Sequence, residues 1–277
     1  MDNRIKIYVA SHKPTEKYGD ECYRLIHVGT SQHPDVRIEG AVLDNKGEDN
    51  ISEKNDKYCE LTGLYYIWKN IHDVDITGLV HYRRFFVKKM KITKEPNSII
   101  LSEDDIQSIM SHNDVILGVP SNKKYAVGGF FKNPLDVPEF AIYRNILPSL
   151  RLLYPEYVED YYQEFFKPAM SFCNMMICKK ELFDQYCEFL FKVLFDAEKR
   201  WVDAGIGVAP REMGYISEYL LNCWIRHNKH LRICYKPIAL FEDTNKIGFK
   251  VHYILDRVGL NKLNPIVDRI YAIFIKK

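Results

Sequence analysis

A short cationic stretch directly follows an apolar run in this sequence. Residues 76–80 read as a buried strand, and the residues that come next are His81, Tyr82, Arg83 and Arg84. In parallel α/β sheets, ligands bind beyond the carboxyl ends of the strands. A histidine and two guanidinium groups at such an edge offer charge and forked hydrogen-bond donors to a phosphate-bearing ligand. A solvated patch of salt-bridged arginines is the alternative, but the aromatic residues among the charges favour a half-buried site.

A second polar group, Ser11, His12 and Lys13, follows the apolar run 5–10, which we expect to form the first strand. Nucleotide-binding α/β domains place base and ribose contacts at this position, and a lysine there can also reach a phosphate. Any strand ends in polar residues, so position alone does not separate a binding group from an ordinary loop.

The stretch 44–55 predicts a helix start, with Asn50 as the N-cap and Glu53 three residues further on. The free N–H groups of a helix N-terminus can bind an anion. Asn50 and Asn55 are therefore candidate contacts for the same ligand. A capped helix that binds nothing explains the pattern equally well.

Glu218 lies on a predicted helix over 212–227, and its neighbours at helical spacing are mainly apolar. Burial raises the pKa of a carboxyl toward the range that suits a general base. A glutamate at the edge of the core, paired with Arg211 or Arg226, is the alternative.

The predicted strands and helices must bring these candidate site residues together. Short apolar runs alternate with helical periodicity, which predicts an α/β fold with a mostly parallel sheet and helices on both faces. Further predicted strands are 24–29 and 115–119. The predicted helices comprise one with a stripe of Tyr58, Leu61, Tyr65 and Trp68, one capped by Ser102 with Asp105, and one over 182–194. The Pro-, Gly- and Tyr-rich region 120–170 has weak periodicity and is interpreted as a segment that covers the substrate.

Length and composition indicate one globular domain. The 277 residues are 47% hydrophobic and 27% charged. We expect a nucleotide-binding half over about 1–120, an acceptor-binding half over about 121–235 and a C-terminal tail over about 236–277. The net charge of +2 argues against a nucleic-acid partner.

Cysteine usage and hydropathy indicate a cytoplasmic protein. The seven cysteines are scattered and never spaced as CxxC, which is typical of reduced thiols. We find neither the apolar core of a signal peptide nor a run of about 20 apolar residues that could span a membrane.

An Asp-x-Asp pair, Asp73 and Asp75, would suit a divalent metal, but it precedes the strand at 76–80 and so lies at the opposite end of the sheet. We therefore expect a loop pair and a site that needs no metal. A Mn²⁺- or Mg²⁺-dependent alternative, with acids such as Glu242 and Asp243 as ligands, stays open.

Six blocks, in this order, resemble one protein family: 6–13, 49–52, 60–65, 78–84, 174–176 and 214–218. The chain resembles, from about residue 5 to about residue 235, the bacterial capsular polysaccharide synthesis glycosyltransferases, long catalogued as a domain of unknown function. The resemblance implies an A-type glycosyltransferase fold and a nucleotide-diphospho-sugar donor. Some members are assigned as inverting galactofuranosyltransferases, so UDP-galactofuranose is the first donor to expect, with a polysaccharide or lipid-linked acceptor.

The same resemblance implies roles for individual residues. The stretch from His81 to Arg84 would replace the acidic metal-binding motif, Asn174 would lie on a strand facing the transferred sugar, and Glu218 would be the catalytic base. The family carries a histidine before an Asp-Leu pair, and 128–136 lacks it here. This departure leaves the identities of the acceptor and of the donor open.

Two further points are open, one on the function of the chain and one on its C-terminal segment. A non-catalytic sugar-nucleotide-binding partner in a polysaccharide assembly complex would share the cationic site without needing a base. The segment 264–277 has helical amphipathicity, which fits docking against the core or peripheral contact with the inner face of the membrane.

Overall fold

The computed structural model describes residues 4–47, 49–91, 93, 95–122 and 137–241, with the backbone alone at 122 and over 137–144. The expectations that concern 128–136, the alternative metal ligands Glu242 and Asp243, and the amphipathic segment 264–277 lie outside the described residues.

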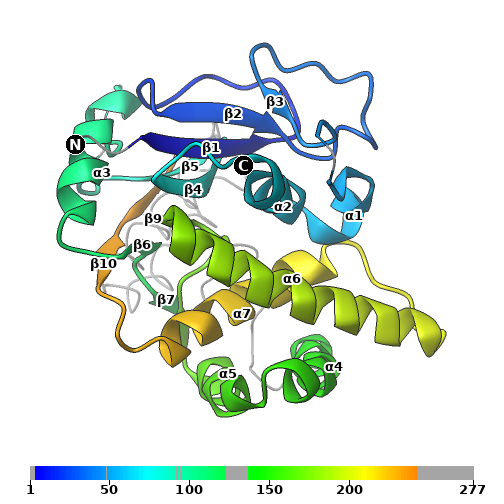
Figure 1. Cartoon of the computed structure of the whole chain (residues 1–277). Coiled ribbons are helices and arrows are strands. Elements are labelled where there is room, and N and C mark those ends of the chain that lie inside the picture. Colours follow the sequence, from blue (N-terminus) through cyan, green and yellow to red (C-terminus); the bar gives the residue numbers. More distant parts are fainter. Residues whose placement is uncertain (1–3, 48, 92, 94, 123–136, 242–277) are drawn as a thin grey trace, which may run out of the picture.

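A central mixed sheet organises the described part of the chain (Figure 1). Its strands are β1 (Ile5–Ser11), β2 (Tyr23–His27), β3 (Val42–Leu43), β4 (Ile76–His81), β5 (Arg84–Phe86), β6 (Val115–Gly118), β9 (Met176–Lys179), β10 (Ile233–Lys236) and β11 (Ile238–Leu240). The main order is β10-β6-β9-β4-β1-β2-β3, and β5 pairs with β4 and β11. A separate short pair joins β7 (Ser121–Asn122) to β8 (Ala169–Met170).

The sheet is mostly parallel, which confirms the predicted fold class. β1 runs parallel to β2 and β4, β2 to β3, and β6 to β10. β9 is antiparallel to both of its neighbours, β4 and β6. Because β9 runs in the opposite direction, the turn that precedes it lies at the same edge as the carboxyl ends of β4 and β6.

Alternation of side chains along the strands creates two cores, one on each face of the sheet. In β1, Tyr8 and Ala10 belong to one buried cluster, whereas Ile7 and Val9 belong to the other. The helices are α1 (Asn55–Tyr58), α2 (Leu61–Asn70), α3 (Glu103–Met110), α4 (Val137–Leu153), α5 (Val158–Phe166), α6 (Lys180–Asp203) and α7 (Glu212–His227), with 3-10 turns at Ser52–Lys54, Pro96–Ser98 and Pro155–Tyr157. Helices α2, α6 and α7 cover the first face and α3 the second (Figure 1).

Three helix predictions are confirmed, among them the helix over 182–194, which lies within α6, and one is wrong. Ser102 caps α3, and its backbone N–H donates to the carboxylate of Asp105. The helix at 212–227 is α7. The helix expected from Asn50 onward is instead broken into the turn Ser52–Lys54, α1 and α2, because Cys59 adopts a φ of 51° between α1 and α2. Asn50 is not its N-cap: that position is occupied by Ile51.

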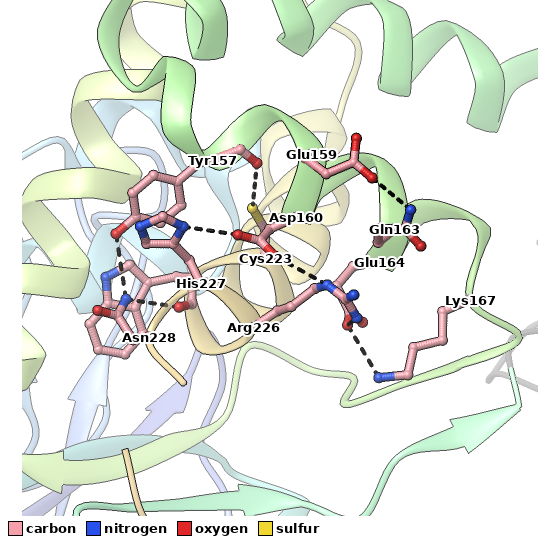
Figure 2. Close-up of polar contacts among 11 residues, drawn as sticks. Tyr157, Glu159, Asp160, Gln163, Glu164, Lys167, Cys223, Arg226, His227 and Asn228 are labelled. Atoms are coloured by element: carbon pink, nitrogen blue, oxygen red, sulfur yellow. Dashed lines mark hydrogen bonds and ion pairs between the residues drawn. The ribbon is translucent and has the colours of Figure 1, made fainter. Parts of the chain in front are cut away.

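The region 120–170 is more regular than its weak periodicity predicts. Its described part contains α4 and α5, and both helices pack against α7. Charged residues connect α5 to the end of α7 (Figure 2): Arg226 Nε lies 3.2 Å from Asp160 Oδ1, and its Nη1 lies 3.3 Å from Glu164 Oε1. His227 Nδ1 lies 2.9 Å from the other Asp160 oxygen. Arg226 therefore pairs with acidic residues of α5 and is not the partner of Glu218.

All seven cysteines are free thiols, as the sequence predicts, and four of them are buried. Burial raises the pKa of Cys178, Cys187 and Cys223, so these thiols stay protonated at neutral pH. Among the described residues, no helix is long and apolar enough to cross a membrane.

Gly78 permits the close contact between β4 and β9. A Cβ at this position would lie 2.2 Å from Met176 O and 2.8 Å from Ile177 Cα. Both neighbours are backbone atoms, so the sheet itself would have to shift to accommodate a side chain.

We expect Gly78→Ala to lower the free energy of unfolding by about 3 kcal/mol or more. Gly207→Ala is the matched control, because no atom lies within 4 Å of the Cβ it would add. Urea denaturation of both variants measures the difference. Equal midpoints for the two variants would contradict this account of the sheet.

Candidate active site

The cationic stretch forms a tight turn between β4 and β5. His81 pairs with Arg84 across this turn, and His81 also lies beside Ala10 of β1. The backbone N–H of Tyr82 donates to Ala10 O at 3.0 Å. The carboxyl ends of β1 and β4 are thus held together. Arg83 and Arg84 occupy successive positions at the end of this turn.

One side of this turn meets the residues that follow β1. The His12 ring packs edge-on against Tyr82 at 5.6 Å between centroids. Lys13 Nζ lies 5.1 Å and the Arg83 guanidinium 5.6 Å from the centre of the same ring. The pKa of His12 is lowered by burial and by the charges of Lys13 and Arg83. Two of the sequence-predicted groups therefore form one cationic surface around Tyr82.

The other side of the turn faces Glu218 on α7. Glu218 is half-buried, and Oε1 accepts a hydrogen bond from the backbone N–H of Cys173 at 2.8 Å. Burial and the neighbouring Glu60 raise its pKa to about 8, although the Cys173 N–H and the charges of Arg84 and Arg211 oppose the rise. A carboxyl with this pKa is ionised mainly above about pH 8, and its ionised form is a stronger proton acceptor than an ordinary carboxylate.

The turn formed by Cys173 and Asn174 connects the parts of this site. Cys173 O lies 2.7 Å from His81 Nε2. Since a carbonyl oxygen can only accept, that histidine nitrogen carries the proton. Asn174 Nδ2 donates to Glu60 Oε1 at 2.8 Å and to Gly214 O at 3.0 Å. This dipeptide therefore contacts β4, the residue before α2, and both Gly214 and Glu218 of α7.

Backbone strain is concentrated at the same place. In the described part of the chain, the non-glycine residues with positive φ are Cys59, Cys173, Asn174 and Arg211. Cys59 precedes Glu60, and the Arg211 N–H donates to Asp56 O at 2.8 Å, which joins α1 to the start of α7. Such conformations cost on the order of 1–3 kcal/mol each and cluster at functional sites. Their convergence around Glu218 supports this edge as the candidate active site.

His81 differs from the expectation that it adds positive charge. Burial lowers its pKa, with the charges of Arg84 and Arg83 acting in the same direction, so the ring is neutral at pH 7. The positive charge of the site therefore comes from Lys13, Arg83 and Arg84. Asn174 also differs in position, because it lies in the turn before β9 and not on a strand.

Ser11, Asn50 and Asn55 stabilise local structure. Ser11 Oγ donates to Lys13 O at 2.6 Å, Asn50 Oδ1 accepts from Ser52 N at 3.3 Å, and Asn55 Nδ2 donates to Cys59 O at 2.7 Å. Asn50 bonds to Ser52 and Asn55 to Thr62, and the hydroxyls of both partners donate to the buried Asp44.

Asp44 holds the loop after β2 against the start of α2. Its carboxylate accepts hydrogen bonds from the backbone N–H groups of Gly29 and Thr30 and from the hydroxyls of Ser52 and Thr62, at 2.5–3.0 Å. Four donors satisfy a charge that would otherwise be costly to bury.

The Asp-x-Asp pair lies before β4, as the sequence predicts. Asp73 accepts from Lys6 Nζ at 3.0 Å, and Asp75 accepts from the Arg4 backbone N–H at 2.8 Å. Their pKa values are lowered by these contacts. In the part of the chain that the structure describes, no group of three or more histidine, cysteine or acidic residues is arranged to hold a metal ion.

Sequence reasoning assigned no role in the site to Glu60 and Cys173, and it considered Arg211 only as a structural partner of Glu218. A glutamate near a helix start is common, and a left-handed cysteine carries no sequence signal of the kind that glycine gives. The one available signal for Glu60 was its place in the 60–65 block.

The solved structures provide a comparison for this fold. One, described as the apo structure of the bifunctional glycosyltransferase WbbM, matches with a TM-score of 0.74 and 26% sequence identity. The match covers 87% of this chain and 46% of that chain, so this chain spans about half the length of its structural relative. The fold is that of an α/β domain of glycosyltransferase-like architecture.

The family profile described as "domain of unknown function (DUF4422)" matches residues 6–229, and the chain belongs to this family. This agrees with the resemblance found in the sequence, whereas the capsular role and the galactofuranosyl donor stay predictions. The comparison with curated proteins gave no match.

We expect Glu218→Gln to become more stable than the wild type as pH rises. The pKa of Glu218 is higher in the folded than in the unfolded chain, so the folded state keeps a proton that the unfolded state releases. Wild-type stability therefore falls between about pH 4.5 and about pH 8, and the glutamine variant escapes this loss. Allowing for partial exposure, the difference at pH 9 should exceed about 1 kcal/mol.

Chemical denaturation at pH 5, 7 and 9 measures this effect, with Glu212→Gln on the same helix as the control. If the difference in free energy of unfolding between wild type and Glu218→Gln does not change with pH, the pKa of Glu218 is not raised in the folded state.

Proposed function

We propose that this protein is a glycosyltransferase that moves a sugar from a nucleotide-diphospho-sugar to a hydroxyl of a saccharide or lipid-linked acceptor. The observation that carries the proposal is a half-buried carboxyl, Glu218, which lies near the charge of Arg84 and is joined through the backbone of Cys173 to His81 at the end of β4. A base and a cationic group on one edge suit a reaction that removes a proton and releases an anion. The similarity to WbbM supports the same class of reaction.

The proposed step is a direct displacement at the anomeric carbon. Glu218 takes the proton from the acceptor hydroxyl as the acceptor oxygen forms its bond to that carbon. The bond from the carbon to the diphosphate breaks, and the electron pair leaves with the diphosphate. Attack from the face opposite the leaving group inverts the anomeric configuration.

The leaving diphosphate would be stabilised by Arg83, Arg84 and Lys13. The two arginines follow one another in the turn, so they can contact a ligand lying along the ends of β1 and β4. Tyr82 fixes the cationic groups on one side, which reduces the reorganisation needed when charge develops. UDP-galactofuranose is the proposed donor and surface polysaccharide the proposed product, both from the family resemblance.

Metal independence is part of the proposal. The side chains of Arg83, Arg84 and Lys13 supply charge that a divalent cation supplies in other transferases. Transfer that persists in EDTA would support it, and loss of transfer in EDTA, with recovery on adding Mn²⁺ or Mg²⁺, would replace it with the metal-dependent alternative.

Glu218→Gln should abolish transfer while leaving the affinity for UDP within about twofold of wild type, because the amide cannot accept the proton yet keeps the shape of the side chain. Single-turnover transfer and calorimetric titration with UDP measure the two properties. Full transfer by this variant would exclude Glu218 as the base. UDP binding without turnover of any nucleotide sugar by the wild type would favour the non-catalytic binding partner.

Arg84→Met should weaken UDP binding by about tenfold, since it removes one charge from the diphosphate site and keeps the length of the side chain. The loss should shrink at high salt, where the wild type also binds less well. Arg151→Met, an exposed arginine in the last turn of α4, is the matched control. Equal affinities of the two variants for UDP would show that Arg84 does not contact the donor.

Peripheral membrane contact through 264–277 and a cytoplasmic location stay predictions from the sequence. Flotation with liposomes, comparing the full chain with a chain ending before residue 264, tests the first of them.

A further inference from the structure

Glu60 is a charged residue of the candidate site that has no role in the proposed transfer. It lies directly before α2, and its side chain is partly buried. Its carboxylate oxygen Oε1 accepts the hydrogen bond from Asn174 Nδ2 at 2.8 Å. The next residue back in the turn, Cys173, donates its N–H to Glu218 Oε1 at the same distance of 2.8 Å. Two carboxyl groups are thus held by adjacent residues of one turn.

The turn holds this pair at an energetic cost. Cys173 has a φ of 78° and Asn174 a φ of 50°, and neither is a glycine. Asn174 is 3% exposed, and its Oδ1 accepts no hydrogen bond from the described residues. The amide orientation follows from its partners, because Glu60 and Gly214 O both accept and so require the NH₂ group. A structure that only needed a turn here would not leave a buried oxygen unpaired beside two carboxylates.

The groups that face Glu218 come from every element packed around it. Glu60 contributes a like charge from the start of α2, and Arg84 on β5 and Arg211 before α7 contribute opposite charges. His81 on β4 is neutral at pH 7. Tyr186 on α6 lies within reach of both carboxylates and stays neutral, because burial raises its pKa well above 10. Glu60 is therefore the group whose charge opposes ionisation of Glu218.

We infer that Glu60 is a positioning residue for Glu218, which acts through the Cys173–Asn174 turn and through its own negative charge to make Glu218 a stronger proton acceptor. This inference rests on the proposed function for its catalytic consequence, but the electrostatic coupling it requires exists with or without transfer. A like charge nearby destabilises the ionised form of a carboxyl, so proton uptake from an acceptor hydroxyl becomes more favourable. The hydrogen bond to Asn174 fixes where that charge lies.

The decisive variant is Glu60→Gln, which keeps an oxygen to accept from Asn174 and removes the charge. The pH midpoint at which Glu218 loses its proton should fall by about one unit. In an active enzyme, the rise of kcat with pH should move down by the same amount. The kcat at the high-pH plateau should fall on the order of threefold, as expected for a weaker base, with KM for the donor unchanged.

The coupling is measured without activity by a cycle of four proteins: wild type, Glu218→Gln, Glu60→Gln and the double variant. The four proteins form two pairs, and the members of each pair differ only by Glu218→Gln. The pH dependence of the stability difference within each pair gives the midpoint of Glu218 with and without the Glu60 charge. Glu212→Gln is the control for a charge on α7 that should leave the midpoint where it is. Glu60→Asp, which keeps a charge on a shorter side chain, should shift the midpoint less than Glu60→Gln.

The outcomes separate the two ideas. A lowered midpoint in Glu60→Gln, with no turnover of any nucleotide sugar by the wild type, supports the pairing and rejects the transferase. Turnover with an unchanged midpoint in Glu60→Gln rejects the pairing and leaves the transferase. If Glu60→Gln and Glu60→Asp both fail to fold, Glu60 is a structural residue and the inference is overturned.

Discussion

The Cys173–Asn174 turn is the constraint on which the site depends. Its backbone reaches His81 and Glu218, and its side chain reaches Glu60 and Gly214. These partners come from three separate parts of the chain, so the turn fixes distances that no single helix or strand could fix. The positive φ angles of both residues are unfavourable on their own, so the surrounding packing must stabilise this geometry.

The charges at this edge are divided between two sides of one short turn. Lys13 and Arg83 gather around Tyr82, whereas Arg84 lies near Glu218 and His81. His81, which is neutral at pH 7, adds no charge of its own on the side of Arg84 and Glu218. Such a separation suits a reaction in which a proton is removed at one point and negative charge develops at another.

Much of the fold follows from the sequence because it depends on short-range patterns. The apolar runs at 5–10 and 76–80, which form buried strands, and the Ser102–Asp105 capping pair depend on neighbouring residues and were predicted correctly. The break at Cys59 and the direction of β9 were not, since a left-handed cysteine has no sequence signal and the side-chain period is the same in parallel and antiparallel strands. For the site, Glu218 was recognisable from its apolar helix, whereas the contact of Glu60 with Asn174 joins residues 114 positions apart.

The direction and place of β9 also bear on how the chain folds as it is synthesised. β9 fills the gap between β4 and β6, yet it is made some 58 residues after β6 ends. Until residues 176–179 emerge from the ribosome, β4 and β6 each have an unpaired edge, and such edges invite pairing with other chains. The first 120 residues therefore form an incomplete sheet, and the nascent chain depends on its later half to close it.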